Sequence, residues 1–508
     1  MSFWDGEQWV KEGPAAGSAP SRGAAFAGGA FAREEVRLPP GPVLVAAVAA
    51  IIGIAVGTGY VVQAAGLVAG IVAIWVSFRW PLLPLFAYAA LIPIEEVLVL
   101  GDLGTLSRLA SILFILAYGL PRIRHLHIEA MPIAAWGYVG WSVLSFGWAI
   151  DRGETLTQIP ILLSLFITSV LIAVVVAERP WIVRPLLWAY SLSAGVTALI
   201  GIAKYLSGSA PVGTNDRVAA IAGQSVAYYA AYLLPALIFC IFELVQYRRV
   251  IIAGAIALAS AVGILISGTR SAWVAAALVI VGFVLPQLRP GRRIAAVAIV
   301  LGLGVLALQL PGISAVVIER ADIALSSGGA GRTDIWTVGL AIYEGAPLTG
   351  VGLANFPVAY TPELVRQSNV GVYSAVNPAN RAPHNIVIGT LGELGPIGFF
   401  LLLLFVLPMI FRRGWGPDAA VVQAGVASLM ITALFLDLLN RKQLWLFFGL
   451  ACGLAYLRNR QREGRLTLAA VTPGALSRRG SPGTPAVGPD GKVKFTGIVT
   501  GDEPPVSG

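Results

Sequence analysis

Two arginines beside short polar turns interrupt an otherwise apolar chain. Arg217 follows the polar stretch 214–216, and Arg270 lies within the polar stretch 267–271, between two apolar runs. Two guanidinium groups at one membrane level can hold a diphosphate through charge-assisted, bidentate hydrogen bonds. The start of the helix expected after Arg270 also favours an anion. The alternative is that each arginine only reaches toward lipid phosphate, as arginines at the ends of membrane helices commonly do.

His384 is the third candidate for chemistry. It lies between Pro383 and Asn385, directly before an apolar run, whereas His125 and His127 fall in a basic loop and read as ordinary solvated residues. An imidazole at the mouth of a helix can act as a general base near neutral pH. The alternative is a surface histidine in a loop. No HxxxH pattern, cysteine pair or carboxylate cluster accompanies it, so we expect no metal.

The composition gives these residues a membrane setting. The 508 residues are 57% hydrophobic and only 12% charged, against roughly 25% charged in soluble domains, and the mean hydropathy is +0.80. This excludes a soluble enzyme, a DNA-binding protein and a disulfide-rich secreted domain. Cys240 and Cys452 lie inside apolar runs, so no disulfide framework is expected. The net charge of +9 is better explained by basic cytoplasmic loops than by nucleic-acid binding.

The apolar runs predict an all-α fold, a polytopic transmembrane helix bundle. Fourteen segments approach the ~20 residues that a spanning helix needs, although several are short, so we expect twelve to fourteen spans. Backbone groups must be satisfied within each helix in lipid. The segments lie near 43–62, 64–79, 82–100, 106–120, 131–150, 158–177, 185–206, 219–243, 250–267, 271–288, 294–310, 385–410, 419–437 and 443–457.

Loop charges predict the orientation and the layout. With the N-terminus in the cytoplasm, cytoplasmic connections carry sixteen basic residues and short outer loops carry five, Arg441 and Lys442 among them. This is a positive-inside bias. We expect a disordered cytoplasmic leader (1–40), transmembrane helices 1–11 (41–310), a long periplasmic or extracellular loop with short helices (311–384), transmembrane helices 12–14 (385–457) and a disordered cytoplasmic tail (458–508).

Further ionisable residues fall inside or at the edge of the expected spans. Such groups are candidates for function by default in a bilayer, and we read them as partly structural pairs and partly cavity lining, with Asp102 a possible partner of Arg108. No Walker loop, nucleotide-binding fold or Asp-x-Asp motif is present, which disfavours a nucleotide-fuelled activity, and we expect no cofactor. These residues are Glu95, Glu96, Asp102, Arg108, Lys204, Glu243 and Asp437.

An ordered set of segments resembles the O-antigen ligase and polymerase superfamily of polytopic membrane proteins. The segments are 217–235, 267–271, 331–336, 347–356 and 384–398, and the resemblance covers roughly a third of the chain, about 215–400. It implies a metal-independent, inverting glycosyltransferase in the inner membrane, with its active site on the outer face. The donor would be an undecaprenyl-diphosphate-linked glycan, and the acceptor a glycan, a lipid or a protein.

The resemblance also implies residue roles. Arg217 and Arg270 would bind the donor diphosphate, and His384 would activate the acceptor hydroxyl. The substrate-binding residues would be Arg332, Arg381 and Asn385, and Glu393 would be structural. One departure is that the stretch after Arg217 lacks the Pro-Asn pair of the family.

Two alternatives to a ligase stay open. A polymerase of the same superfamily would join repeat units and need a second lipid-diphosphate site. A polytopic transporter, for bicarbonate or a glycolipid, would line a path with Glu95, Glu96 and Lys204. A transporter predicts inverted-repeat halves, and we detect no such symmetry, so a glycosyltransferase is favoured.

Overall fold

The computed structural model describes residues 2–4, 9–11, 61–96, 98, 104–208, 219, 225–247, 250–309, 318, 332–368, 370, 381–411 and 417–471. The chain divides into two compact units, residues 1–78 and 79–508. In the first unit, strands β1 (Ser2–Trp4) and β2 (Trp9–Lys11) pair antiparallel, and helix α2 covers Val61–Arg79. The strands lie within the expected leader, which stays a prediction because most of it falls outside the described residues.

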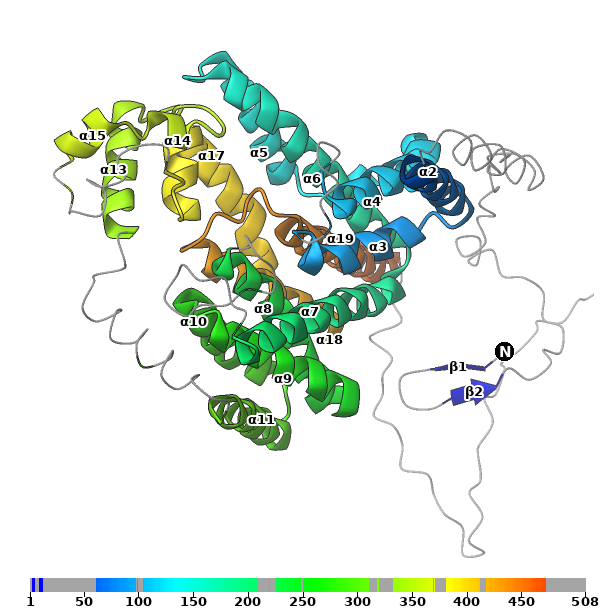
Figure 1. Cartoon of the computed structure of the whole chain (residues 1–508). Coiled ribbons are helices and arrows are strands. Elements are labelled where there is room, and N and C mark those ends of the chain that lie inside the picture. The colour runs from blue at the N-terminus through cyan, green and yellow to red at the C-terminus, as the bar shows by residue number, and fades with distance from the viewer. Residues whose placement is uncertain are drawn as a thin grey trace, which may run out of the picture. The chain divides into compact units, whose positions relative to one another are not determined.

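The described part of the second unit is built from helices (Figure 1). The longer ones are α3 (Leu83–Leu91), α4 (Leu106–Phe114), α5 (Ile133–Leu144), α6 (Arg152–Glu178), α7 (Val183–Leu206), α8 (Val226–Tyr247), α9 (Val250–Ile266), α10 (Arg270–Val279), α11 (Pro290–Leu308), α13 (Arg332–Gly345), α17 (Ile386–Phe411), α18 (Pro417–Ala433) and α19 (Lys442–Val471). The shorter ones are α14 (Phe356–Ala359), α15 (Pro362–Gln367), η1 (Ile92–Ile94), η3 (Ile115–Gly119), η4 (Leu120–His125), η5 (Ile128–Ala130), η6 (Ser145–Gly147), η7 (Pro180–Ile182), η8 (Ile280–Val284) and η9 (Leu285–Gln287).

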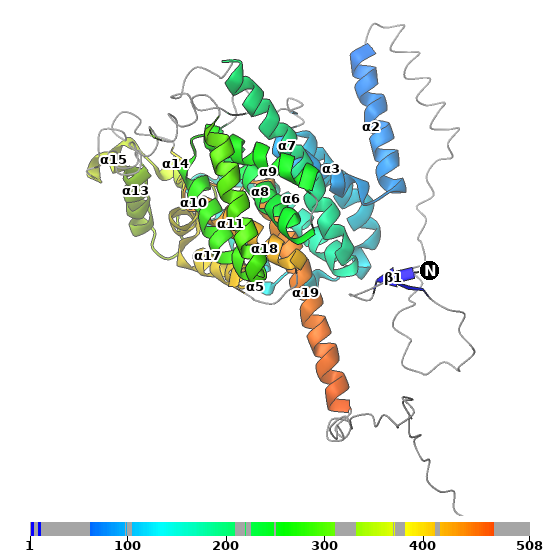
Figure 2. The same cartoon turned by 90° about the horizontal axis from the view of Figure 1, so that it is seen from below.

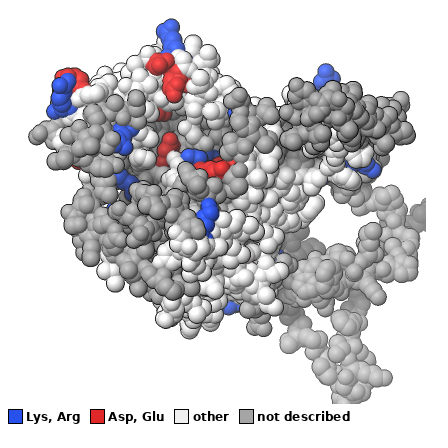
Figure 3. Space-filling view, in the orientation of Figure 1, with Lys and Arg blue, Asp and Glu red and all other residues white. Residues whose placement is uncertain are grey.

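The fold is an all-α polytopic membrane protein, as the sequence predicts. Among the described residues, five helices are long and apolar enough to cross a bilayer: Leu106–His125, Arg152–Glu178, Pro180–Leu206, Val226–Tyr247 and Ile386–Phe411. Shorter apolar helices accompany them. Residues 43–60 of the expected span at 43–62 lie outside the described residues, and every other expected span overlaps a described helix. Figure 3 shows that most of the described surface on the face in view is uncharged, as expected for a protein surrounded by lipid.

Helix α19 differs from the expected span at 443–457. It continues to Val471, and Figure 2 shows it extending past the neighbouring helices. Residues 458–465 are polar and basic and residues 466–471 are mostly apolar, and both stretches continue the helix because a turn of helix once formed propagates at low cost. The boundary at 458, where the sequence indicates a tail, is therefore not a helix end.

Helices α6 and α19 pack more closely than side chains of ordinary size allow. A Cβ on Gly449 would lie 2.7 Å from the Ser169 carbonyl oxygen, and one on Gly453 would lie 2.6 Å from that of Ala173. Two small residues four positions apart are a common means of close helix approach in membranes. These glycines therefore let the backbone of α19 rest on α6.

We expect Gly449→Ala to lower the melting temperature of the detergent-solubilised protein. Alanine in place of glycine ordinarily favours a helix by about 1 kcal/mol, but here the methyl group would meet the α6 backbone, at a cost of roughly 1–3 kcal/mol. The matched control is Gly302→Ala in α11, whose Cβ would meet nothing within 4 Å, and it should leave the melting temperature equal or higher. Equal responses of the two variants would contradict close α6–α19 packing.

Candidate functional site

The start of α17 fixes the position of His384. The Asn385 side-chain oxygen accepts hydrogen bonds from the backbone N–H groups of Val387 (2.8 Å) and Ile388 (3.1 Å), and so caps the helix. His384 itself has a φ of +46°, which is uncommon for a residue other than glycine. Pro383 is buried against Gly389, where an added Cβ would lie 2.8 Å from the proline ring. The cap and the proline contact together hold the histidine in this backbone conformation.

Two arginines act on the His384 imidazole. Burial, followed by the positive charges of Arg332 and Arg381, lowers the pKa of His384 below its ordinary 6.5. The neutral imidazole, which can accept a proton, is therefore favoured at neutral pH. The structure thus brings together three residues that the sequence identifies as candidates, whereas Asn385, expected to contact substrate, uses its amide oxygen in the helix cap.

Helix α13 brings Arg332 to this group. Its buried face contains Ile335, Val338 and Ile342, and a Cβ on Gly339 would lie 2.4 Å from the Ile388 side chain. This close approach packs α13 against the first turn of α17. Figure 1 shows α13, α14 and α17 as neighbours. Arg332 is the first residue of α13, so the docking of the helix sets the place of the arginine.

The glycine-rich segment 349–356 packs against a kink in α17 and forms hydrogen bonds with it. Pro396 lacks the N–H that would bond the carbonyl of Gly392, and Gly395, with a φ of +64°, departs from helical geometry. The N–H groups of Val351 and Gly352 donate instead to the carbonyls of Gly392 (2.9 Å) and Glu393 (2.8 Å).

Glycine is required on both sides of this contact. A Cβ on Gly350 would lie 2.4 Å from the Glu393 carbonyl carbon, and one on Gly395 would lie 2.4 Å from the Leu348 oxygen. Gly350 also has a φ of +69°, a conformation that glycine adopts at little cost. The glycine pattern of segments 347–356 and 391–398 is thus explained by the direct contact of two backbones.

Asn355 ties the same segment to the start of α6. Its side chain is fully buried, its oxygen accepts from the Asp151 N–H (2.6 Å), and its nitrogen donates to the Thr155 hydroxyl (2.7 Å). The Glu393 carboxylate accepts from the Phe356 N–H (3.3 Å). Both polar side chains are therefore engaged in holding the fold around the kink.

Arg270 begins α10 directly after a tight turn. The Ser267 hydroxyl donates to the Ile264 carbonyl (2.7 Å) and accepts from the Thr269 N–H (3.2 Å). The Thr269 hydroxyl donates to the carbonyl of Val226 (3.2 Å), the first residue of α8. The turn is thereby fixed to α8, and the half-buried Arg270 forms no ion pair with any described residue. Arg217, its expected companion, lies outside the described residues, as does Asp102.

Arg441 is a residue that the sequence prediction of the site missed. Its guanidinium lies 3.5 Å from the centre of the Tyr228 ring and 3.5 Å from a Glu96 carboxylate oxygen. The neighbouring Lys442 pairs with Glu95, so the two acidic residues meet the two basic ones. A usable signal exists, because the Glu95-Glu96 and Arg441-Lys442 doublets both end apolar runs on the same side of the expected bundle.

The comparisons with known proteins agree with the helical membrane fold. No curated protein matches the chain. Residues 255–403 match the family model described as O-Antigen ligase, and this stretch contains Arg270, Arg332, Arg381, His384 and the kink at Gly395. Such a family implies a glycosyltransferase-type enzyme that uses lipid-linked glycans. The match supports the assignment of this chain to the O-antigen ligase and polymerase superfamily.

Proposed function

We propose that the protein moves an oligo- or polysaccharide from an undecaprenyl-diphosphate carrier to an acceptor hydroxyl at the outer face of the inner membrane. The observation that carries the proposal is the His384 imidazole beside Arg332 and Arg381 at the capped start of α17, within the matched stretch 255–403. A general base and fixed cations are the groups that such a transfer needs.

The reaction is a single displacement at the anomeric carbon. The acceptor oxygen attacks from the face opposite the diphosphate, and the bond between the anomeric carbon and the phosphate oxygen breaks. The diphosphate leaves with the bonding electrons, His384 takes the proton of the acceptor hydroxyl, and the anomeric centre inverts. Because the leaving group is already activated, its developing charge needs only fixed cations, and the step proceeds without a metal.

Each cation has its own part in this scheme. Arg270, at the start of α10 and without an ion-pair partner among the described residues, binds the diphosphate together with Arg217. Arg332 and Arg381 bind substrate and also disfavour a protonated His384, since their charges lower its pKa. Asn385 contributes through its cap on α17.

The outer-face assignment rests on the charges of the loops. Sixteen basic residues in the connections on the opposite side favour cytoplasmic termini, and with alternating spans we expect His384 and Arg270 on the outer side. A ligase and a repeat-unit polymerase share this donor chemistry and differ in the acceptor. A transporter path lined by Glu95 and Glu96 is disfavoured, because both carboxylates have basic partners in Lys442 and Arg441.

Arg270→Ala and His384→Ala should abolish glycan transfer by the reconstituted protein while expression and membrane insertion stay normal. Loss of a general base alone costs roughly 10²–10⁴-fold in rate. The assay is transfer from an undecaprenyl-diphosphate oligosaccharide in proteoliposomes. Arg366→Ala is the control, since Arg366 is 74% exposed and, among the described residues, pairs with Glu363 on its own helix. Wild-type turnover in both test variants would refute the site.

Arg270→Lys should be strongly impaired although the charge is kept. A guanidinium holds two phosphate oxygens through parallel hydrogen bonds, and an ammonium acts as a point charge. The measurement is the KM for the lipid-diphosphate donor in the same assay. A KM close to that of the wild type would mean that only the positive charge of Arg270 matters.

Activity should persist below pH 6.5. A lowered pKa means that His384 stays neutral, and able to accept a proton, to a lower pH than a free imidazole with its pKa of 6.5. We expect the acid limb of kcat/KM against pH to lie below that value, and to move upward in Arg332→Gln because one neighbouring charge is removed. An acid limb at or above 6.5 in the wild type would exclude His384 as the titrating base.

A further inference from the structure

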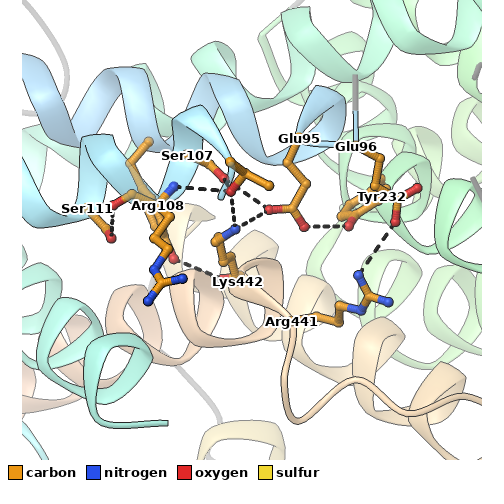
Figure 4. A network of polar contacts seen from close by, with 10 residues as sticks. Glu95, Glu96, Ser107, Arg108, Ser111, Tyr232, Arg441 and Lys442 are labelled. Atoms are coloured by element: carbon orange, nitrogen blue, oxygen red, sulfur yellow. Dashed lines mark hydrogen bonds and ion pairs between the residues drawn. The ribbon is translucent and has the colours of Figure 1, made fainter. Parts of the chain in front are cut away.

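A buried ion pair joins two residues that lie far apart in the sequence. The Lys442 ammonium lies 2.5 Å from a Glu95 carboxylate oxygen, and their side chains are 17% and 6% exposed. Figure 4 shows the Glu95 carboxylate between Lys442 and Tyr232. Such a pair is costly unless hydrogen bonds satisfy the remaining polar atoms.

Those hydrogen bonds are present. The hydroxyls of Tyr232 (2.8 Å) and Ser107 (3.0 Å) donate to the two oxygens of Glu95. The Lys442 ammonium donates also to the Thr105 hydroxyl (2.8 Å). The pair thus joins the residue after η1, the start of α4, the first half of α8 and the first residue of α19. This network fixes where α19 begins.

Arg441 precedes this fixed residue and is placed by it. Its guanidinium lies over the Tyr228 ring and beside Glu96, at 3.5 Å in both cases. A charge-assisted hydrogen bond is usually about 2.7–2.9 Å long, so the contact with Glu96 is a loose ion pair. The Arg441 side chain remains 28% exposed, and a guanidinium has five N–H donors. Its guanidinium is thus more exposed than the Lys442 ammonium, whose side chain is 17% exposed.

Arg441 and Arg270 border the same turn of one helix. Thr269, next to Arg270, donates to the carbonyl of Val226 at the start of α8, and Arg441 lies over Tyr228, two residues further along. Thr269 and Arg441, which come from the start of α10 and from the turn before α19, thus both contact the first turn of α8. A ligand with two phosphate groups bound at Arg270 therefore lies at the same end of α8 as a further cation.

We propose that Arg441 is an additional phosphate-binding residue of this site, which contacts the diphosphate of the lipid-linked donor, while Glu96 keeps its guanidinium over Tyr228 before the donor binds. The assignment rests on the proposed function. It does not follow from the family match, because Arg441 lies outside residues 255–403.

The test is a binding measurement that needs no turnover. The full-length protein in lipid nanodiscs is titrated with undecaprenyl diphosphate and, separately, with undecaprenyl monophosphate. Arg441→Ala should weaken diphosphate binding by about 10- to 100-fold, the range expected for a lost charged hydrogen bond, and monophosphate binding by much less. Arg152→Ala is the control, because Arg152 is exposed and donates to the nearby Gly147 carbonyl; it should bind as the wild type does.

Glu96→Gln separates binding from a merely structural role. If Glu96 only holds Arg441 in place electrostatically, removal of its charge should keep or strengthen diphosphate binding, whereas a structural pair predicts that both variants weaken it. Arg441→Lys, which keeps the charge and most of the volume, covers the case in which Arg441→Ala fails to fold. A fivefold or greater loss of affinity in this folded variant supports the proposal.

Three results would overturn it. They are unchanged diphosphate affinity in the folded Arg441 variants, a parallel loss in Glu96→Gln, or an equal loss for undecaprenyl diphosphate, undecaprenyl monophosphate and phosphatidylglycerol, which would make Arg441 a general lipid contact. Failure of the proposed function is distinguishable, because a wild-type protein that binds undecaprenyl diphosphate but transfers no glycan refutes the enzyme and leaves this binding role intact.

Discussion

The kink of α17 is the constraint on which the candidate site depends. A proline in the fourth place after Gly392 leaves a carbonyl without its helical donor, and a buried carbonyl without a partner costs about 1–3 kcal/mol. The glycine-rich segment supplies the donors through Val351 and Gly352. Because this segment continues into Asn355 and Phe356, the same contact ties α17 to α6 and seats α13 beside it. The contact between segment 349–356 and the kink of α17 thus determines the relative positions of Arg332 and His384.

Two charge arrangements among the described residues contrast with each other. Around Glu95 every strong donor and acceptor has a close partner, so the arrangement is structural and rigid. Around His384 the neighbours are cations, which disfavour its protonation. A rigid, satisfied network and a histidine flanked by cations suit an enzyme that must hold an anionic ligand in a fixed geometry.

The sequence predicts the helices well, since runs of about 20 apolar residues admit one structure in lipid. The resemblance to the O-antigen ligase and polymerase superfamily also assigns His384, Arg332 and Arg381 to one site, and the charges of the two arginines do act on the histidine. It does not predict the pairing of Glu95 with Lys442 or of Arg441 with Tyr228, since apolar periodicity does not identify which helices become neighbours. The helix cap by Asn385 could have been predicted from the sequence, because asparagine directly before a helix is a common N-cap. Arg217 lies outside the described residues and keeps its predicted role.

The Glu95–Lys442 pair has a consequence for biosynthesis. The two residues are 347 positions apart, and at 5–20 residues per second a ribosome needs roughly 20 to 70 s to travel from one to the other. Throughout that interval Glu95 has already been synthesised, whereas Lys442, which neutralises its charge, has not. The nascent bundle therefore cannot close around its polar centre until the last helix is inserted, and a chain that ends before α19 leaves an acidic group without its partner.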